Sequence, residues 1–261
     1  MSDRVRLRVF LTAGLAFGVL LVWGLAGLPD FGHYRGPLGN IYNAISVPER
    51  SSTDVVTTVN FDFRGFDTLG EEFILFAAVV GVASLLRRLR GERERHPDDD
   101  AVGRHVPETS LAIRAVGLGL VAPTVLIGLY IVGHGQQTPG GGFQGGVILA
   151  SALLLTYLAG DYLTLRRVGP TELIEGAEGA GASGFVLIAA AGLVFAGAFF
   201  ENWLPVGKPG TLLSAGTIPL DNLAVGLAVA GGFCFMLIEF LQQTLVRRRR
   251  RGGGDATRTR P

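Results

Sequence analysis

Residues 115–132 read AVGLGLVAPTVLIGLYIV, a run without one charged side chain. The hydrocarbon core of a bilayer is about 30 Å thick and takes roughly 20 apolar residues to cross as a helix, so this run predicts a transmembrane segment. The sequence contains five more runs of the same kind, at residues 10–28, 69–86, 143–159, 184–200 and 223–246. The sequence therefore predicts an all-α integral membrane protein with six transmembrane helices.

The composition agrees with this fold class and argues against several functions. Charged residues make up 17% of the chain, whereas soluble domains carry about 25%. The single cysteine, Cys234, cannot form an internal disulfide, and the sequence has no Cys/His cluster with metal-ligand spacing. It also has no nucleophile–base set and no cofactor motif, so we expect neither enzyme activity nor a bound metal or cofactor.

The basic residues predict the orientation of the chain, because cytoplasmic loops of membrane proteins are enriched in Lys and Arg. With the N-terminus inside, only four of the 23 basic residues fall on the outer side, namely Arg35, Arg50, Arg64 and Lys208. The opposite orientation inverts this ratio, so both termini are predicted to be cytoplasmic. The first run also fits a signal peptide, but it is long and no small-residue cleavage site follows it, so we expect it to be retained.

Polar stretches divide the predicted helices into two groups. Residues 91–106 contain Pro97 and three consecutive aspartates, a composition typical of a linker. The prediction is therefore a two-helix segment at 1–90, this cytoplasmic linker, a four-helix domain at 107–246 and a basic disordered tail at 247–261. The arginines of the tail also fit RNA or anionic-lipid binding, but a stop-transfer anchor explains them, and we expect no nucleic-acid partner.

Residues 133–146 read GHGQQTPGGGFQGG and connect two predicted helices on the outer side. No strand precedes this segment and no Gly-Lys-Ser/Thr ending follows, which argues against nucleotide binding. Two glycine pairs at small-xxx-small spacing, 141/145 and 142/146, favour close packing of the next helix on a neighbour. His134 fits two interpretations: a titratable group where the turn lines an ion path, or part of a packed interhelical turn.

Residues 60–72 read NFDFRGFDTLGEE and lead into the second predicted transmembrane helix. The segment Thr68–Glu71 has the spacing of a capping box, in which the two side chains satisfy backbone N–H groups at a helix start. Ionisable groups at membrane depth also suggest an ion pathway, and several gather here: Arg64, Asp67, Glu71 and Glu72. Capping and an ion pathway are compatible hypotheses for these side chains.

The outer connection at 29–68 carries one regular pattern. Val59, Phe61 and Phe63 alternate with polar residues. This period of two predicts a short strand or an amphipathic segment that lies on the membrane surface.

Acids are scarce within the predicted spans. Glu239 is the deepest, because it lies about 12 Å along a helix from the first arginine of the tail, and we predict a buried acid that snorkels or pairs with a partner subunit. The only lysine, Lys208, falls in a loop. A proton relay needs a chain of titratable groups, so this composition favours one subunit of a complex over a self-sufficient transporter.

Two segments resemble known families. Pro139–Gly146 has the pattern Pro-Gly-Gly-Gly-Phe-x-Gly-Gly and resembles the signature of the B subunit of Mrp-type sodium/proton antiporters, the MnhB family, over about 106–246. Residues 62–71, DFRGFDTLGE, resemble the MbhE-type segment in the C-terminal part of the large A subunit, over about 11–89. The motif residues carried over by this resemblance are Pro139, Gly140, Gly141, Gly142 and Phe143 in the turn, and Arg64, Asp67 and Glu71.

The resemblance implies a subunit of a hetero-oligomeric antiporter in a bacterial or archaeal cytoplasmic membrane, which exchanges internal sodium for external protons. Its partners would be large proton-channel subunits and small membrane subunits within the lipid bilayer. The A-type piece precedes the B-type piece in one chain here, and the proton-pumping core of the A subunit must come from another chain. Relatives in hydrogenases and complex I keep a redox-driven ion pump open as an alternative, and a purely structural assembly role also stays open.

Overall fold

The computed structural model describes residues 3–28, 36–86, 110–160 and 162–252. The regular elements of the described residues are helices, without a strand among them, and one isolated β-bridge joins Val206 to Ala215. In chain order the elements are α1 (Asp3–Ala26), α2 (Pro37–Arg50), α3 (Val55–Thr58), a π-helix (Val59–Phe63), α4 (Gly65–Leu86), α5 (Leu111–Gly133), α6 (Gly142–Ala159), α7 (Tyr162–Val168), α8 (Thr171–Phe195) and α9 (Ile218–Gly252). The predicted linker at 91–106 lies outside the described residues.

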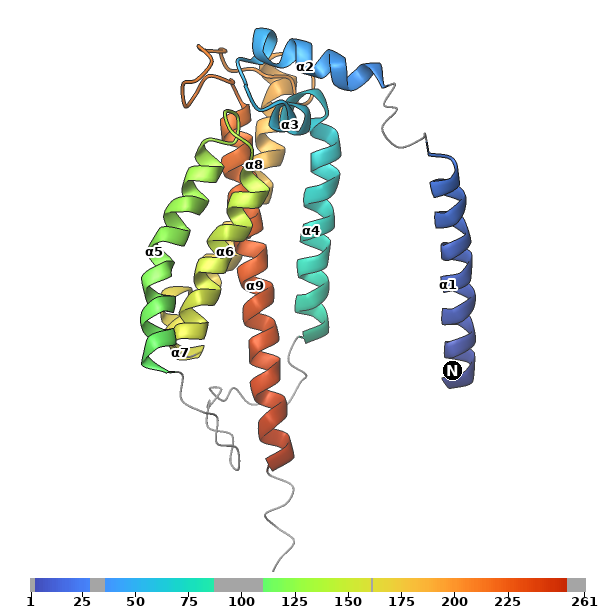
Figure 1. Cartoon of the computed structure of the whole chain (residues 1–261), viewed down its shortest axis with the longest axis vertical. Coiled ribbons are helices and arrows are strands. Elements are labelled where there is room, and N and C mark those ends of the chain that lie inside the picture. Colours follow the sequence, from blue (N-terminus) through green and yellow to red (C-terminus); the bar gives the residue numbers. More distant parts are fainter. Residues whose placement is uncertain (1–2, 29–35, 87–109, 161, 253–261) are drawn as a thin grey trace, which may run out of the picture. The chain divides into compact units, whose positions relative to one another are not determined.

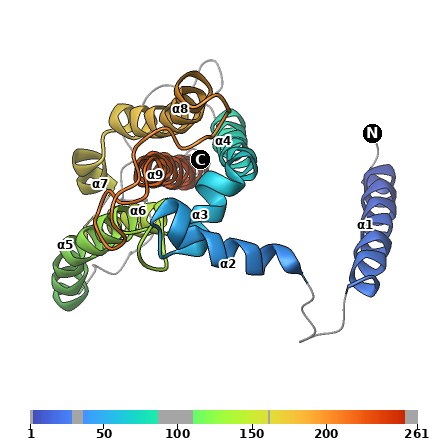
Figure 2. The same ribbon diagram turned by 90° about the horizontal axis from the view of Figure 1, so that it is seen from above.

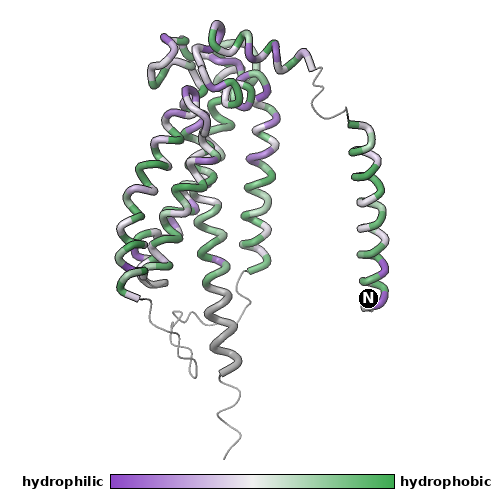
Figure 3. The backbone as a smooth tube through the Cα atoms, in the orientation of Figure 1, coloured by the Kyte–Doolittle hydropathy of each residue, from purple (hydrophilic) through white to green (hydrophobic). Residues whose placement is uncertain are grey.

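Six of the described helices, α1, α4, α5, α6, α8 and α9, are long and apolar enough to cross a membrane, which confirms the predicted number. Figure 3 shows apolar residues along these helices and polar residues at the segments that connect them. The bounds differ most for α8, which begins at Thr171 rather than at 184. The basic tail was predicted to be disordered from 247, but α9 continues to Gly252, and residues 253–261 lie outside the described part.

The contacts divide the chain into two units, residues 1–41 and 42–261. In the first unit, the span Leu7–Ala26 of α1 contains no buried residue. In the second unit, α9 is the central helix, with α4, α6 and α8 packed against it and α5 packed against α6 (Figures 1 and 2). Helix α4 therefore packs with the helices that follow the predicted linker.

Two clusters of buried apolar side chains hold the second unit together. One lies around Phe185 of α8, whose ring contacts Phe61 at a centroid distance of 5.9 Å and Phe200 at 5.3 Å. The other joins Val79 of α4 to residues of α8 and α9. Because helices within a bilayer associate through van der Waals packing rather than by leaving water, the close fit of these clusters fixes how α4, α8 and α9 sit against one another.

The predicted short strand around 59–63 is wrong, because these residues form the π-helix that joins α3 to α4. The alternative, an amphipathic segment on the membrane surface, stays a prediction. The carboxylate of Asp54 caps α3 by accepting hydrogen bonds from the Val56 N–H and the Thr57 hydroxyl, both at 3.0 Å. Once a helix starts there, Phe61 turns inward and is buried. The alternation of apolar and polar residues thus reflects a wide helical turn rather than an extended strand.

The predicted capping box at Thr68–Glu71 is also wrong. Helix α4 begins at Gly65, so Thr68 already lies inside its first turn. The Thr68 hydroxyl donates a hydrogen bond of 2.7 Å to the carbonyl oxygen of Asn60. It thereby satisfies an acceptor at the wide turn that precedes α4 instead of capping a helix start.

Candidate functional site

The three predicted acids at the start of α4 have different surroundings. Asp67 is exposed and forms an ion pair with Arg64, which is exposed as well. Glu71 is also exposed, but Glu72 is buried, with 7% of its surface accessible. Successive residues of a helix point about 100° apart, which explains why two adjacent glutamates differ in this way. Of the three acids, Glu72 alone faces the interior of the unit.

Glu72 lines a cavity of about 480 Å³ between α4 and α8. Helix α4 contributes Leu69, Glu72, Phe73 and Phe76 to the lining. Helix α8 contributes Gly179, Ala182, Ser183, Val186 and Leu187. Glu72 is the one charged group of this lining, and the hydroxyl of Ser183 is the other polar side chain. The pocket is open on one side, where Phe73 and Leu187 are exposed. A buried carboxyl beside such a pocket is suited to exchange a proton or to contact a cation.

A second buried acid, Glu178 of α8, escapes the sequence-based prediction. It is 8% exposed, and its Oε1 atom has no hydrogen-bond partner among the described residues. The apolar run begins only at residue 184, which leaves Glu178 in a predicted loop. The signal that could have found it is the i, i+3 spacing of Glu172, Glu175 and Glu178, which continues a helix backwards from the apolar run.

The Gly-rich turn after α5 is held by the segment that follows α2. The carbonyl oxygen of Gln136 accepts hydrogen bonds from the Ser52 hydroxyl at 2.9 Å and from the backbone N–H groups of Thr53 and Asp54 at 3.1 and 3.2 Å. The Gln136 side chain is fully buried and donates to the carbonyl of Leu212. The turn therefore connects three parts of the chain that are distant in sequence.

His134 is half-buried at the C-terminal end of α5. Its ring stacks on Tyr130 with a centroid distance of 4.1 Å, and its Nδ1 atom lies 3.1 Å from the Tyr130 carbonyl oxygen. These contacts come from its own helix and support the packed-turn interpretation of His134. The other interpretation, that His134 is a titratable group on an ion path, stays a prediction.

The glycines that follow bring α6 against its neighbours. Gly140 and Gly141 have backbone φ angles of +147° and +131°, which residues other than glycine rarely adopt. A Cβ atom at Gly145 would lie 2.8 Å from the Gly128 carbonyl of α5, and one at Gly142 would lie 2.9 Å from the Gly226 N atom of α9. The motif therefore sets the close approach of α6 to both α5 and α9, as its small-residue spacing predicts.

Asn222 of α9 completes this junction and was also missed. Its side chain is fully buried, its Oδ1 accepts a hydrogen bond of 2.8 Å from the Gly142 N–H, and its Nδ2 donates to the Ile218 carbonyl at 3.1 Å. It thus satisfies one of the free N–H groups at the start of α6.

We expect Asn222→Ala to lower stability by about 1–3 kcal/mol, the penalty for leaving a buried N–H group unsatisfied. Thermal unfolding of the purified protein in detergent measures the effect. Asn202 offers a matched control at a less buried site, because its side chain also bridges backbone groups, at Thr217 and Ala215. Equal stability of Asn222→Ala and the parent protein would contradict the role of Asn222.

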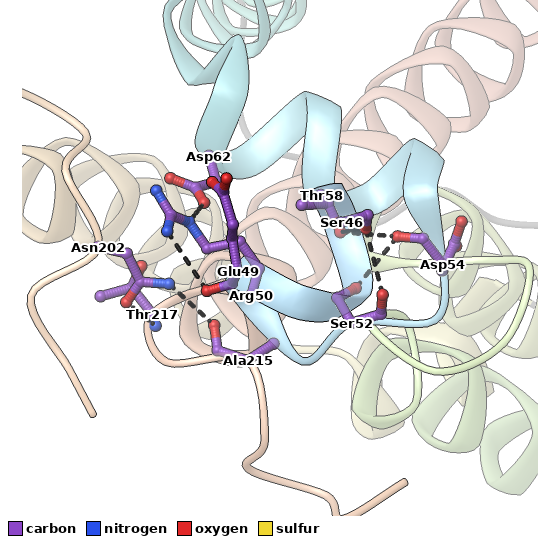
Figure 4. Close-up of polar contacts among 10 residues, drawn as sticks. All are labelled: Ser46, Glu49, Arg50, Ser52, Asp54, Thr58, Asp62, Asn202, Ala215 and Thr217. Carbon is purple, nitrogen blue, oxygen red and sulfur yellow. Dashed lines mark hydrogen bonds and ion pairs between the residues drawn. The ribbon is translucent and has the colours of Figure 1, made fainter. Parts of the chain in front are cut away.

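A buried polar cluster covers the same end of the helices (Figure 4). Arg50 forms an ion pair with Asp62, whose side chain is 5% exposed. Burial raises the pKa of the Asp62 carboxyl above its ordinary value, although the hydrogen bond and the charge of Arg50 act in the opposite direction. Nearby, the Ser46 hydroxyl lies 2.9 Å from the Thr58 hydroxyl.

Two further acids lie on α9. Asp221 is buried at the start of the helix, and its Oδ1 atom has no hydrogen-bond partner among the described residues. Glu239, which we predicted to be buried, is only half-buried. No group of three or more His, Cys, Asp or Glu residues in the described part of the chain has the arrangement of a metal site.

Comparison with known proteins agrees with these observations. A family model described as a domain related to the MnhB subunit of the Na⁺/H⁺ antiporter matches residues 112–235, and one described as the E subunit of MBH matches residues 32–99. An uncharacterised protein of Methanocaldococcus jannaschii is 31% identical over 230 residues, which cover 81% of this chain and 85% of the relative.

Two further relatives have functional descriptions. The B subunit of the Na⁺/H⁺ antiporter of Bacillus subtilis is 37% identical over 113 residues, which cover 41% of this chain and 76% of the relative. The A/B subunit of the probable K⁺/H⁺ antiporter of Rhizobium meliloti is 33% identical over 184 residues, which cover 61% of this chain and 18% of the relative.

Two solved structures share the fold. A chain of the archaeal membrane-bound sulfane sulfur reductase, a respiratory membrane complex, is 33% identical with a TM-score of 0.68, and the match covers 90% of this chain and 97% of that one. A chain of the Mrp complex from Dietzia sp. is 25% identical with a TM-score of 0.67, and the match covers all of this chain and 27% of that one.

The fold, the site and these relatives define a multi-pass membrane subunit of a complex of the Mrp-like cation/H⁺ antiporter type. The chain belongs to the MnhB family, and its N-terminal part matches the MbhE type.

Proposed function

We propose that this subunit contributes Glu72 to the ion route of a monovalent cation/proton antiporter, with sodium as the cation. The observation that carries the proposal is the placement of Glu72, a buried carboxyl that lines a cavity between two membrane-spanning helices. The likeness to the B subunit of the Na⁺/H⁺ antiporter of Bacillus subtilis supports sodium as the cation.

The charge distribution of the sequence supports an orientation with both termini in the cytoplasm of a bacterium or archaeon. In this orientation the end of the bundle that carries Glu72 and the Gly-rich turn faces outwards. Glu72 is then reached from the outer side, where external protons would enter. Large proton-channel subunits and small membrane subunits would complete the route, since acids within the spans of this chain are few.

Glu72→Gln tests the proposal, because the amide keeps the size of the side chain but cannot exchange a proton. We expect cation/proton exchange in membrane vesicles to fall about a hundredfold, the lower end of what a positioned proton-transfer group contributes. Glu175→Gln is the matched control, since it makes the same change on an exposed glutamate of α8. Assembly is checked by co-purification of the partner subunits.

We expect Glu175→Gln to retain exchange within about a factor of two, which corresponds to less than 0.5 kcal/mol. Full exchange by a normally assembled Glu72→Gln complex would remove Glu72 from the route. The chain would then have the purely structural assembly role.

A redox-driven ion pump is the second candidate, and a specific observation favours it. The match to the sulfane sulfur reductase complex extends over almost the whole of both chains. Co-purification from the native membrane, with mass-spectrometric identification of the partners, separates the two candidates. Partners that bind iron–sulfur clusters or nickel would assign the chain to a redox machine, and their absence from a complex with proton-channel subunits would assign it to an antiporter.

A further inference from the structure

The carboxyl of Glu178 lies at the seam of three membrane-spanning helices. A Cβ atom at Gly232 of α9 would lie 3.6 Å from its Oε1 atom and 3.1 Å from Val79 of α4. The backbone of Glu178 itself approaches α9 closely, because a Cβ atom at Gly231 would lie 2.6 Å from the Glu178 N atom. Two consecutive glycines of α9 therefore make the room that the Glu178 residue and its carboxyl occupy.

The depth of this carboxyl follows from the helices that surround it. Val79 lies about 21 Å along α4 from its first residue, and Gly232 lies about 21 Å along α9 from its first residue, at 1.5 Å per residue. On α8, which runs in the opposite direction, Glu178 lies about 25 Å from Phe195 at the same end. The hydrocarbon core is about 30 Å thick, so the carboxyl lies within it, roughly 5–9 Å from its inner side.

A carboxylate at this position lacks compensation. Oε1 has no hydrogen-bond partner among the described residues, and no ion pair of Glu178 is present there either. The nearest acid on its own helix, Glu175, is exposed and has the same charge. An isolated buried charge is strongly unfavourable, so burial favours the neutral acid over an unpaired carboxylate at this position.

The pocket at Glu72 ends at the residue next to Glu178 on α8. Its lining extends on α4 from Leu69 to Phe76 and on α8 as far as Gly179, the residue next to Glu178. Along α4, Glu72 precedes Val79 by seven residues, or about 10 Å. This gap is too long for a direct hydrogen bond, so proton transfer between the two carboxyls requires bridging water. The polar side chains of the pocket lining that can hold such water are Glu72 and Ser183.

We propose that Glu178 is a proton-binding site inside the membrane and receives protons from Glu72 on the same route. This proposal rests on the function proposed above. A proton that enters at Glu72 passes through water in the cavity and adds to the Glu178 carboxylate to give the neutral acid, and the cation bound there leaves towards the outer side. The O–H bond breaks when a cation arrives at the seam, and the proton returns to water on the other side. The entering cation replaces the proton, so charge is balanced at every stage.

The test labels the complex in its native membranes with dicyclohexylcarbodiimide, an apolar reagent that reacts with protonated carboxyl groups, and maps the adducts by mass spectrometry. We expect adducts on Glu178 in acidic and neutral buffer, with less labelling when sodium is added. Glu175 is the internal control, since it is exposed one turn away and is expected to stay unlabelled. No adduct on Glu178 in acidic buffer, where Glu72 is labelled, would overturn the proposal.

Transport separates this proposal from the one on which it rests. We expect Glu178→Gln to lower exchange about a hundredfold with normal assembly, Glu178→Asp to keep part of the exchange, and Glu175→Gln to behave like the parent complex. Loss of exchange in Glu72→Gln together with full exchange in Glu178→Gln would overturn the role of Glu178 and leave that of Glu72 intact. Labelling of Glu178 with full exchange in Glu72→Gln would instead overturn the role of Glu72 and leave Glu178 as a proton-binding site.

Discussion

Gly181→Val is expected to destabilise the protein by about 3 kcal/mol or more, at the upper end of the range for an overpacked core. Gly181 lies on α8 where this helix crosses α9. A Cβ atom there would lie 2.6 Å from the Ala224 carbonyl oxygen and 2.8 Å from the Ala228 Cα atom. Both are backbone atoms, so no side chain can move aside and the two helices must separate.

The effect is measured as the fall in thermal unfolding temperature in detergent and as the loss of the monodisperse complex in size-exclusion chromatography. Gly176→Val serves as the control, because Gly176 is on the same helix but a Cβ atom there meets nothing within 4 Å. Its expected effect is within about 0.5 kcal/mol, as for ordinary surface positions. Equal stability of the two variants would show that the α8–α9 contact is looser than the structure has it.

Arg50→Met is expected to lower stability by about 3–5 kcal/mol at neutral pH, because it leaves the buried Asp62 carboxylate without its partner. Methionine keeps most of the length of the arginine stem, so the loss reports the charge and its hydrogen bond. The comparison is Arg64→Met, which breaks the ion pair between Arg64 and Asp67 at the start of α4. Both groups of the Arg64–Asp67 pair are more than half exposed, so that loss should stay below about 1 kcal/mol.

The stability loss of Arg50→Met is expected to depend on pH, because it involves the ionised form of Asp62. Since burial raises the pKa of Asp62, the folded state favours the protonated carboxyl, and this stabilisation is present at low pH and lost as the pH rises through the folded-state value. Removal of Arg50 takes away the group that favours the ionised form. The deficit of Arg50→Met should therefore be small in acid and grow towards neutral pH, whereas that of Arg64→Met should change little. A deficit independent of pH would mean that Arg50 acts by packing alone.

The sequence predicts the six spans well, because long apolar runs depend on the bilayer thickness and on no tertiary contact. It predicts the start of α4 poorly. A capping box at Thr68 and a strand at Val59 both follow from local patterns. In the structure, Asp54 caps a helix that begins before both of them, and the burial of Phe61 fixes the π-helix that leads into α4. Tertiary packing thus decides between local alternatives that the sequence alone leaves open.

The candidate site shows the same limit. The glutamate pair at 71 and 72 is visible in the sequence, but which of the two faces inwards depends on the phase of α4 against α8 and α9. Glu178 escapes because its helix begins with glutamates and small residues, whose mean hydropathy conceals a buried position. Asn222 escapes because a single polar residue in an apolar run gives no indication of the backbone N–H that it serves.

The hydrogen bonds around residues 51–54 have a consequence for how the two halves of this protein are joined. Ser51 donates to the Gly207 carbonyl and accepts from the Ser214 hydroxyl, while its neighbours bond to Gln136. These bonds, together with the packing of α4 on α9, tie residues 42–86 to the piece after residue 109 without help from the peptide chain between them. We therefore expect the two pieces to associate when they are expressed from two separate genes.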